Sequence, residues 1–124
     1  MQASFTIEGR MPGLNEYTKA IGSNYHKGAA MKRRETERAA WCAKAAQVPR
    51  FRGPVRVTFH WFEPDRGKKR DVDNVAFAKK FILDGLKMAG VIVDDSPKYV
   101  VGFKDVFSYS NDPHIVVTLS GRGR

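Results

Sequence analysis

Several residue types and sequence features are scarce or missing here, and each absence excludes a class of protein. The one cysteine, Cys42, cannot form an internal disulfide, and no histidine or second cysteine stands at zinc-ligand spacing from it. No apolar run approaches the roughly 20 residues of a membrane span, and the N-terminus shows no secretion signal. A glycine-rich phosphate loop is also missing. We therefore expect a cytoplasmic protein with no membrane partner and no nucleotide cofactor.

Acidic residues are few as well. The chain of 124 residues has 13 Asp and Glu against 22 Lys and Arg, which gives a formal charge of +9. Such an excess favours polyanionic partners, nucleic acid first among them, although a basic surface also keeps a protein soluble. Charge alone leaves both interpretations open.

Glycine and proline divide the first half of the chain into segments of different periodicity. Residues 3–9 and 53–64 are predicted as strands, the second because its apolar residues alternate. Residues 10–24 are interrupted by proline and two glycines, so they are predicted as a loop with at most a helical turn. Residues 28–47 are rich in Ala, Glu, Lys and Arg, which predicts a long helix.

The second half predicts one more helix and then strands. Asn74 can cap a helix that ends at Gly90, and three later segments are predicted as strands, residues 91–93, 98–109 and 114–121. This alternation predicts an α+β fold, a small mixed β-sheet with two main helices packed on it. We expect a single domain over residues 1–119 and a basic tail over residues 120–124.

The stretch "RDVDNVAFAKK", residues 70–80, places two aspartates one residue apart and then turns apolar. If this stretch begins as an extended segment, Asp71 and Asp73 project to the same side. A pair of carboxylates suits Mg²⁺, or Mn²⁺ as a substitute, better than zinc. A third acid from "VDDSP" would complete a metal site, and a strand over residues 91–93 would point Asp94 and Asp95 to opposite sides. Both motifs are also ordinary turn formers.

Cations stand close to these acids in the sequence. They could hold phosphates beside a metal ion, which favours phosphodiester chemistry. The candidate DNA-binding residues are Lys68, Lys69 and Arg70, directly before the acids, and Lys32, Arg33 and Arg34 in the first predicted helix. A charged helix face of this kind is also typical of simple solvent exposure.

The segment "RDVDNVAFAKKFILDGLKMAGVIVDDSPKYV" resembles the signature of the RusA-type Holliday junction resolvases, which are endodeoxyribonucleases of phages and prophages. The N-terminal "GRMPGLNEYTKA" is similar to the opening of the same family. The resemblance implies a homodimer in a bacterial cell or a phage-infected host, acting on branched DNA, the four-way junction. It also implies a Mg²⁺-dependent endonuclease of recombination and repair that cuts symmetrically.

Residue by residue, the resemblance implies that Asp71, Asp73 and Asp95 bind Mg²⁺ and that Lys80 assists catalysis. The family's shorter pattern has its lysine four residues after the second aspartate, whereas Lys80 follows Asp73 by seven. Lys79 is therefore the rival. It shares an otherwise apolar helix face, so we expect it to need a carboxylate partner. The alternative to an enzyme is a non-catalytic, basic nucleic-acid-binding protein whose acids only form turns.

Overall fold

The computed structural model describes residues 1–121, which form four strands and four helical segments. None of these helices is both long and apolar enough to cross a membrane. In chain order the elements are β1 (Gln2–Glu8), α1 (Leu14–Ser23), α2 (Tyr25–Ala45), β2 (Val55–Pro64), α3 (Val72–Ala76), α4 (Lys79–Met88), β3 (Val100–Ser110) and β4 (His114–Gly121).

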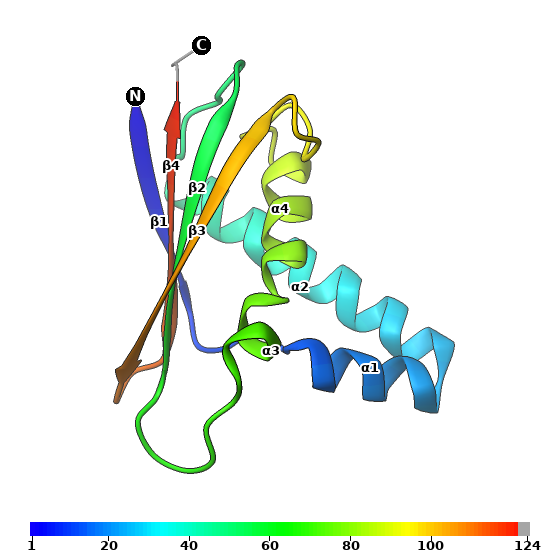
Figure 1. Cartoon of the computed structure of the whole chain (residues 1–124). Helices are drawn as coiled ribbons and strands as arrows, with labels where there is room; N and C mark the ends of the chain where they lie inside the picture. The colour runs from blue at the N-terminus through cyan, green and yellow to red at the C-terminus, as the bar shows by residue number, and fades with distance from the viewer. Residues whose placement is uncertain (122–124) are drawn as a thin grey trace.

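The strands form one mixed sheet in the order β1-β4-β2-β3. β4 runs antiparallel to both of its neighbours, and β2 runs parallel to β3. The parallel pair is joined by a crossover that contains α3 and α4, and all the helices lie on one side of the sheet (Figure 1). This arrangement confirms the predicted α+β fold with a small mixed sheet.

The core lies between the sheet and the two helices α2 and α4. Alternate residues of β2, from Val55 to Trp61, are buried toward the helices, as the predicted alternation requires. The helices cross closely at Gly85, where an added Cβ would lie 2.7 Å from the Cβ of Ala39 and 2.8 Å from the carbonyl oxygen of Thr36. This close contact fixes the position of α4, and therefore of the acidic segment before it.

The prediction of a loop over residues 10–24 is wrong, because Leu14–Ser23 form the helix α1. The Glu16 carboxylate accepts a hydrogen bond from the backbone N–H of Gly13 at 2.6 Å, which satisfies one of the free donors at the helix start. The next helix packs against α1 where Gly28 lies under Ile21, since an added Cβ would be 2.6 Å from that side chain. Tertiary contact and capping thus outweigh the low helix propensity of the glycines and the proline in this segment.

The single helix predicted from Asn74 to Gly90 is in fact two helices. Asn74 lies inside α3, and Phe77 and Ala78 form a turn before α4 begins. Phe77 stacks on Tyr17 of α1 with ring centroids 5.4 Å apart, so the break lets α3 follow α1 while α4 follows α2. The predicted end of the helix is confirmed by the positive φ of 75° at Gly90.

The strand predicted over residues 91–93 does not form. Val91 and Ile92 are both buried at 3% exposure, whereas Val93 is 38% exposed, so the segment has no strand alternation. The carbonyl of Val91 instead accepts a hydrogen bond from the N–H of Phe51 at 2.8 Å. We expected a strand to point Asp94 and Asp95 to opposite sides of the sheet, and without that strand the expectation loses its ground.

The two ends of the described chain meet. The amino group of Met1 donates to the carbonyl of Gly121 at 2.7 Å, and the N–H of Gly121 donates back to the carbonyl of Met1 at 2.9 Å. Ser120 and Gly121, predicted as the start of the tail, thus belong to β4. The rest of the predicted tail, residues 122–124, lies outside the described residues.

Candidate active site

The paired acids begin a short helix and do not lie on an extended segment. Asp71 occupies the N-cap position of α3, with extended φ and ψ, and its carbonyl accepts the N–H of Val75 at 3.0 Å. Asp73 lies in the first turn. Both are exposed, and the Asp71 carboxylate makes no capping hydrogen bond. The expected strand geometry is wrong because α3 begins at Val72, between the two aspartates.

Asp71 lines an open cleft of about 860 Å³. Two elements far apart in the sequence form its walls: the loop and helix start at residues 10–16, and the segment from Lys68 to Asn74. Met31 and Glu35 of α2 complete the lining. The exposed cations Lys68 and Lys69 therefore share one cleft with an acid of the candidate metal pair, which is the juxtaposition expected from the sequence.

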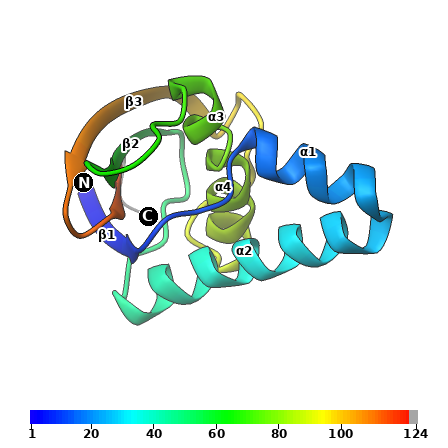
Figure 2. The ribbon, with the colours of Figure 1, turned by 90° about the horizontal axis from the view of Figure 1, so that it is seen from below.

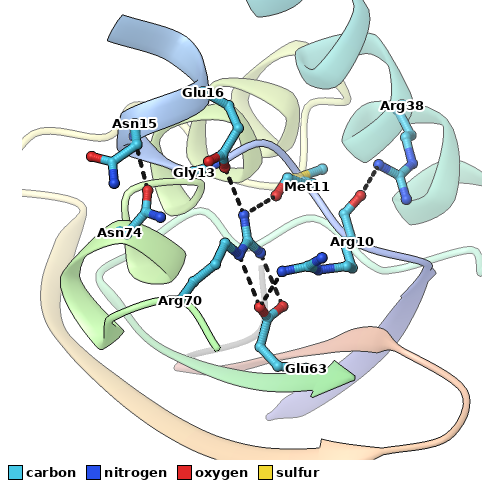
Figure 3. A network of polar contacts seen from close by, with 9 residues as sticks. All are labelled: Arg10, Met11, Gly13, Asn15, Glu16, Arg38, Glu63, Arg70 and Asn74. Carbon is cyan, nitrogen blue, oxygen red and sulfur yellow. Dashed lines mark hydrogen bonds and ion pairs between the residues drawn. The ribbon is translucent and has the colours of Figure 1, made fainter. Parts of the chain in front are cut away.

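Arg70 is held by carboxylates, as Figure 3 shows. Its Nε and Nη2 donate to the two oxygens of Glu63 at 2.9 and 3.0 Å, and its Nη1 donates to Glu16 at 2.9 Å and to the carbonyl of Met11 at 3.1 Å. Glu63 also accepts from Arg10 at 2.9 Å. The Arg70 side chain is only 14% exposed. Through these contacts the guanidinium of Arg70 links the loop before α3 to β2 and α1. DNA contact by Arg70 stays a prediction.

The charges in this network shift the pKa values of its acids. Burial alone would raise the pKa of Glu63, but hydrogen bonds and charge from Arg70 and Arg10 outweigh burial and hold that pKa below its ordinary value. The pKa of Glu16 is lowered as well, since the Gly13 N–H and Arg70 outweigh the opposing effect of burial. Both carboxylates are therefore ionised at neutral pH and keep Arg70 in place.

Acid should weaken the fold through this network. Because the pKa of Glu63 is lower in the folded chain, its contribution to stability is full above the ordinary value of 4.5 and is lost as the pH falls through the lowered value. We expect the free energy of unfolding, measured by urea titration from neutral pH to about pH 3, to fall less steeply in Glu63→Gln than in the wild type. Glu37→Gln, at an exposed position of α2, should keep the wild-type slope. Equal slopes in all three proteins would contradict the network's role.

Asn74 fixes α3 against α1. Its buried side-chain oxygen accepts the N–H of Asn15 at 2.9 Å. Gly13 leaves room for this contact, because an added Cβ would lie 2.4 Å from both the carbonyl and the side-chain oxygen of Asn74. The two aspartates are thus carried by a helix that is anchored on both sides, by Arg70 before it and by Asn74 within it.

Asp95 lies apart from these acids. The loop that carries it follows α4 and lies at the end of that helix opposite α3 (Figure 1). Its carboxylate lies 3.7 Å from the amino groups of both Lys80 and Lys87. Lys80 also pairs with Asp84 at 3.1 Å and is 51% exposed. The structure therefore brings Asp95 together with the predicted catalytic lysine.

Within residues 1–121, no group of three His, Cys, Asp or Glu side chains is arranged to hold a metal ion. The set Asp71, Asp73 and Asp95 accordingly does not form a three-acid site in one chain. The reason is the missing strand at residues 91–93, which was expected to place the third acid beside the first two in the sheet. The metal role of these residues stays a prediction.

Lys79 has the carboxylate partner that its apolar helix face led us to expect. Its amino group donates to Asp105 of β3 at 2.5 Å and lies 5.1 Å from the centroid of the Phe103 ring. The other oxygen of Asp105 accepts from Trp61 Nε1 at 2.9 Å. Lys79 thus links α4 to the sheet, on a different side of the helix from Lys80.

The two lysines should differ in their effect on stability. The side chains of Lys79 and Asp105 are 22% and 23% exposed, so Lys79→Ala leaves a largely covered carboxylate without its cation and should lower the free energy of unfolding by about 1–2 kcal/mol. Lys80→Ala, at an exposed pair, should change it by less than about 0.5 kcal/mol. Urea denaturation measures both. The reverse order of effects would contradict these assignments.

The remaining candidate cations lie on the surface of α2. Lys32, Arg33 and Arg34 are exposed, and they lie in the sequence between Met31 and Glu35, which line the cleft. Arg34 also approaches Glu35 at 3.3 Å. Met31 and Glu35 are the residues through which α2 lines the cleft, so DNA contact by these three cations stays a prediction.

A family model described as endodeoxyribonuclease RusA matches residues 10–120 of the chain. The chain belongs to the RusA endodeoxyribonuclease family. The match confirms the resemblance seen in the sequence and covers every residue that lines the cleft, from Arg10 to Asn74. RusA-family membership makes the chain an endonuclease of the kind that resolves Holliday junctions in DNA. No curated protein is significantly similar to it.

Two functional contacts of this RusA-family chain were missed from the sequence. In the sequence, Glu63 was assigned only to the end of a strand. An acidic residue that follows a run of aromatic residues and precedes Pro64 does, however, indicate a cationic partner in the fold. Asp105 interrupts the apolar positions of its strand in the same way. The partner cations are Arg70, seven positions after Glu63, and Lys79, which lies 26 positions before Asp105.

Proposed function

We propose that the chain is a Mg²⁺-dependent, structure-selective endonuclease that resolves four-way DNA junctions by symmetric hydrolysis, as a homodimer. The observation that carries this proposal is the cleft in which Asp71 lies with Lys68 and Lys69, within the matched range of the family. Cations there can hold phosphates beside an acid. A dimer would match the approximate two-fold symmetry of the junction.

The roles follow the placement of the side chains. Asp71 and Asp73 are proposed as ligands of a divalent cation, because both are exposed carboxylates on the anchored helix α3. A bound Mg²⁺ would supply an activated water and charge stabilisation at the phosphate. Asp95 is proposed as the third ligand, but it does not meet the other two within one described chain, so we derive no step through the metal.

Cleavage of a labelled four-way junction with and without Mg²⁺ tests the proposal. Paired nicks at symmetric positions, present only with the divalent cation, are expected. A linear duplex of the same sequence is the control substrate and should stay intact. Junction binding without cleavage under any divalent cation would instead favour a non-catalytic, basic DNA-binding protein.

Junction binding should weaken steeply with salt. Each phosphate contact adds about 0.9 to the slope of log affinity against log salt, because counterions are released. Lys68→Ala combined with Lys69→Ala should reduce that slope by about 2 in a fluorescence-anisotropy titration. The control pair Lys44→Ala and Lys98→Ala removes the same charge away from the cleft and should leave the slope unchanged. If the two double variants gave equal slopes, the phosphates would bind at a site other than Lys68 and Lys69.

A further inference from the structure

The two edges of the sheet differ in chemistry. β1 forms one edge, where its helix-facing residues Phe5 and Ile7 are buried and its other side is polar. β3 forms the other edge and is the longest strand, with 11 residues, or about 36 Å of chain. An edge strand of this length presents unpaired backbone groups to another chain.

The helix-facing side of β3 is only partly covered by the helices, since Lys79 of α4 reaches Asp105 and Phe103 alone of this row. Phe103 and Phe107 pair in register with Val57 and Trp61 of β2, which are buried, yet they are themselves 52% and 38% exposed. Val101 and Tyr109 continue the row at 47% and 63% exposure. Figure 2 shows the cause, since β3 lies at the rim of the curved sheet, beyond α3 and α4. We call these four side chains the β3 patch.

Charge on β3 favours a second copy of this chain over DNA as the occupant. The strand carries one lysine and one aspartate, Lys104 and Asp105, in a chain whose formal charge is +9. Asp105 is paired with Lys79, which lies within the same chain. Two such basic chains repel one another over most of their surface, and they can meet most easily at an apolar strand whose own lysine and aspartate cancel in charge. The strand itself offers DNA one lysine against one aspartate, and the further cations nearby, Lys69 and Lys79, lie over the rings of Tyr109 and Phe103.

The β3 patch also reaches the candidate active site. Phe107 and Tyr109 line a small cavity of about 150 Å³ together with Arg70 and Val72, which flank Asp71. The amino group of Lys69 lies 4.7 Å from the centroid of the Tyr109 ring. A partner seated on the patch would therefore touch the loop that carries the acids.

We propose that the β3 patch is the dimer interface, where a second copy of this chain docks with its own β3 in antiparallel pairing about a two-fold axis. This inference rests on the homodimer of the proposed function and names its contact surface. A two-fold arrangement brings the same patch of both copies together. The contact therefore covers the four side chains of the patch in each copy, Val101, Phe103, Phe107 and Tyr109. The sheet then continues from one copy into the other.

Sedimentation velocity over a wide range of protein concentration tests the interface. Phe103→Asp and Val101→Asp should each raise the dissociation constant of the dimer by about 30-fold or more, because each places an unpaired charge in an apolar contact of both copies. Val101 is 47% exposed, so it serves where Phe103→Asp impairs folding. Trp41→Asp changes the charge equally at a 71% exposed aromatic of α2 and should leave the dimer intact.

Single cysteines supply a second measurement. In a Cys42→Ser background, cysteines placed in turn at the four patch positions should cross-link on oxidation at the position nearest the two-fold axis, and Trp41→Cys should not. A monomeric wild type, or a dimer that neither Asp variant weakens and no patch cysteine cross-links, would overturn the interface. Cleavage by a monomer would overturn the homodimer but leave the nuclease activity standing, whereas a β3 dimer without cleavage would overturn the nuclease activity alone.

Discussion

Asp71→Asn is expected to abolish cleavage of a four-way junction, with a loss of about 100-fold or more, while junction binding survives. Asp71 is an exposed carboxylate at the start of α3, in the cleft with Lys68 and Lys69. Whether it holds a cation or takes a proton, asparagine cannot replace its charge. Binding should become equal or tighter, since a negative charge is removed beside the phosphates. Single-turnover cleavage and anisotropy titration measure the two effects separately.

Asp65→Asn is the matched control for this substitution. It removes the same charge from an exposed aspartate in the loop before α3, outside the cleft. Its cleavage rate should stay close to that of the wild type. If both variants cut at the wild-type rate, Asp71 has no part in the reaction, and the cleft is not the active site.

Gly85→Val is expected to destabilise the fold by about 3 kcal/mol, an overpacking effect at the closest contact between α2 and α4. An added Cβ would lie 2.8 Å from the carbonyl oxygen of Thr36 and 2.9 Å from the backbone nitrogen of Ala40. Backbone atoms cannot rotate away, so the helices must separate. Urea denaturation monitored by circular dichroism should show the loss as a lower midpoint.

The control for this substitution is Gly22→Ala. Gly22 lies within α1, where an added Cβ meets nothing within 4 Å. Alanine there should stabilise the protein by about 0.5–1 kcal/mol through its higher helix propensity. A Gly85→Val variant as stable as the wild type would mean that the two helices do not cross at this glycine.

The strands were predictable from the alternation of their apolar residues, and the long helix from its amino-acid composition. Residues 55–61 alternate between buried and less buried positions, and α2 is composed of strong helix formers. The helix α1 was not predictable, since its start depends on Glu16 reaching back to Gly13 and its packing depends on Gly28 of the next helix. Such contacts outweigh local propensity, which is a weak signal in so short a segment.

The candidate site was predictable in its residues but not in its geometry. Spacing and sequence order picked out Asp71, Lys68 and Lys69, which the fold places in one cleft. The expected strand parity failed because α3 begins between the two aspartates. The ion pairs of Arg70 with Glu63 and Glu16 join residues 7 and 54 positions apart, and no local pattern encodes the longer of these contacts.

The central position of β4 has a consequence for the order in which the molecule can assemble on a ribosome. β4 is the last of the described elements to be synthesised, yet it lies between β1 and β2 and is the strand with which β1 pairs. β1 therefore waits without a partner until residues 114–121 have emerged. The loop that follows β1 carries Arg10 to its contact with Glu63 at the edge of the cleft. In a nascent chain that stops before His114, β2 and β3 can pair, but β1 has no neighbouring strand to hold Arg10 near Glu63, so the cleft is among the last parts of the molecule to form.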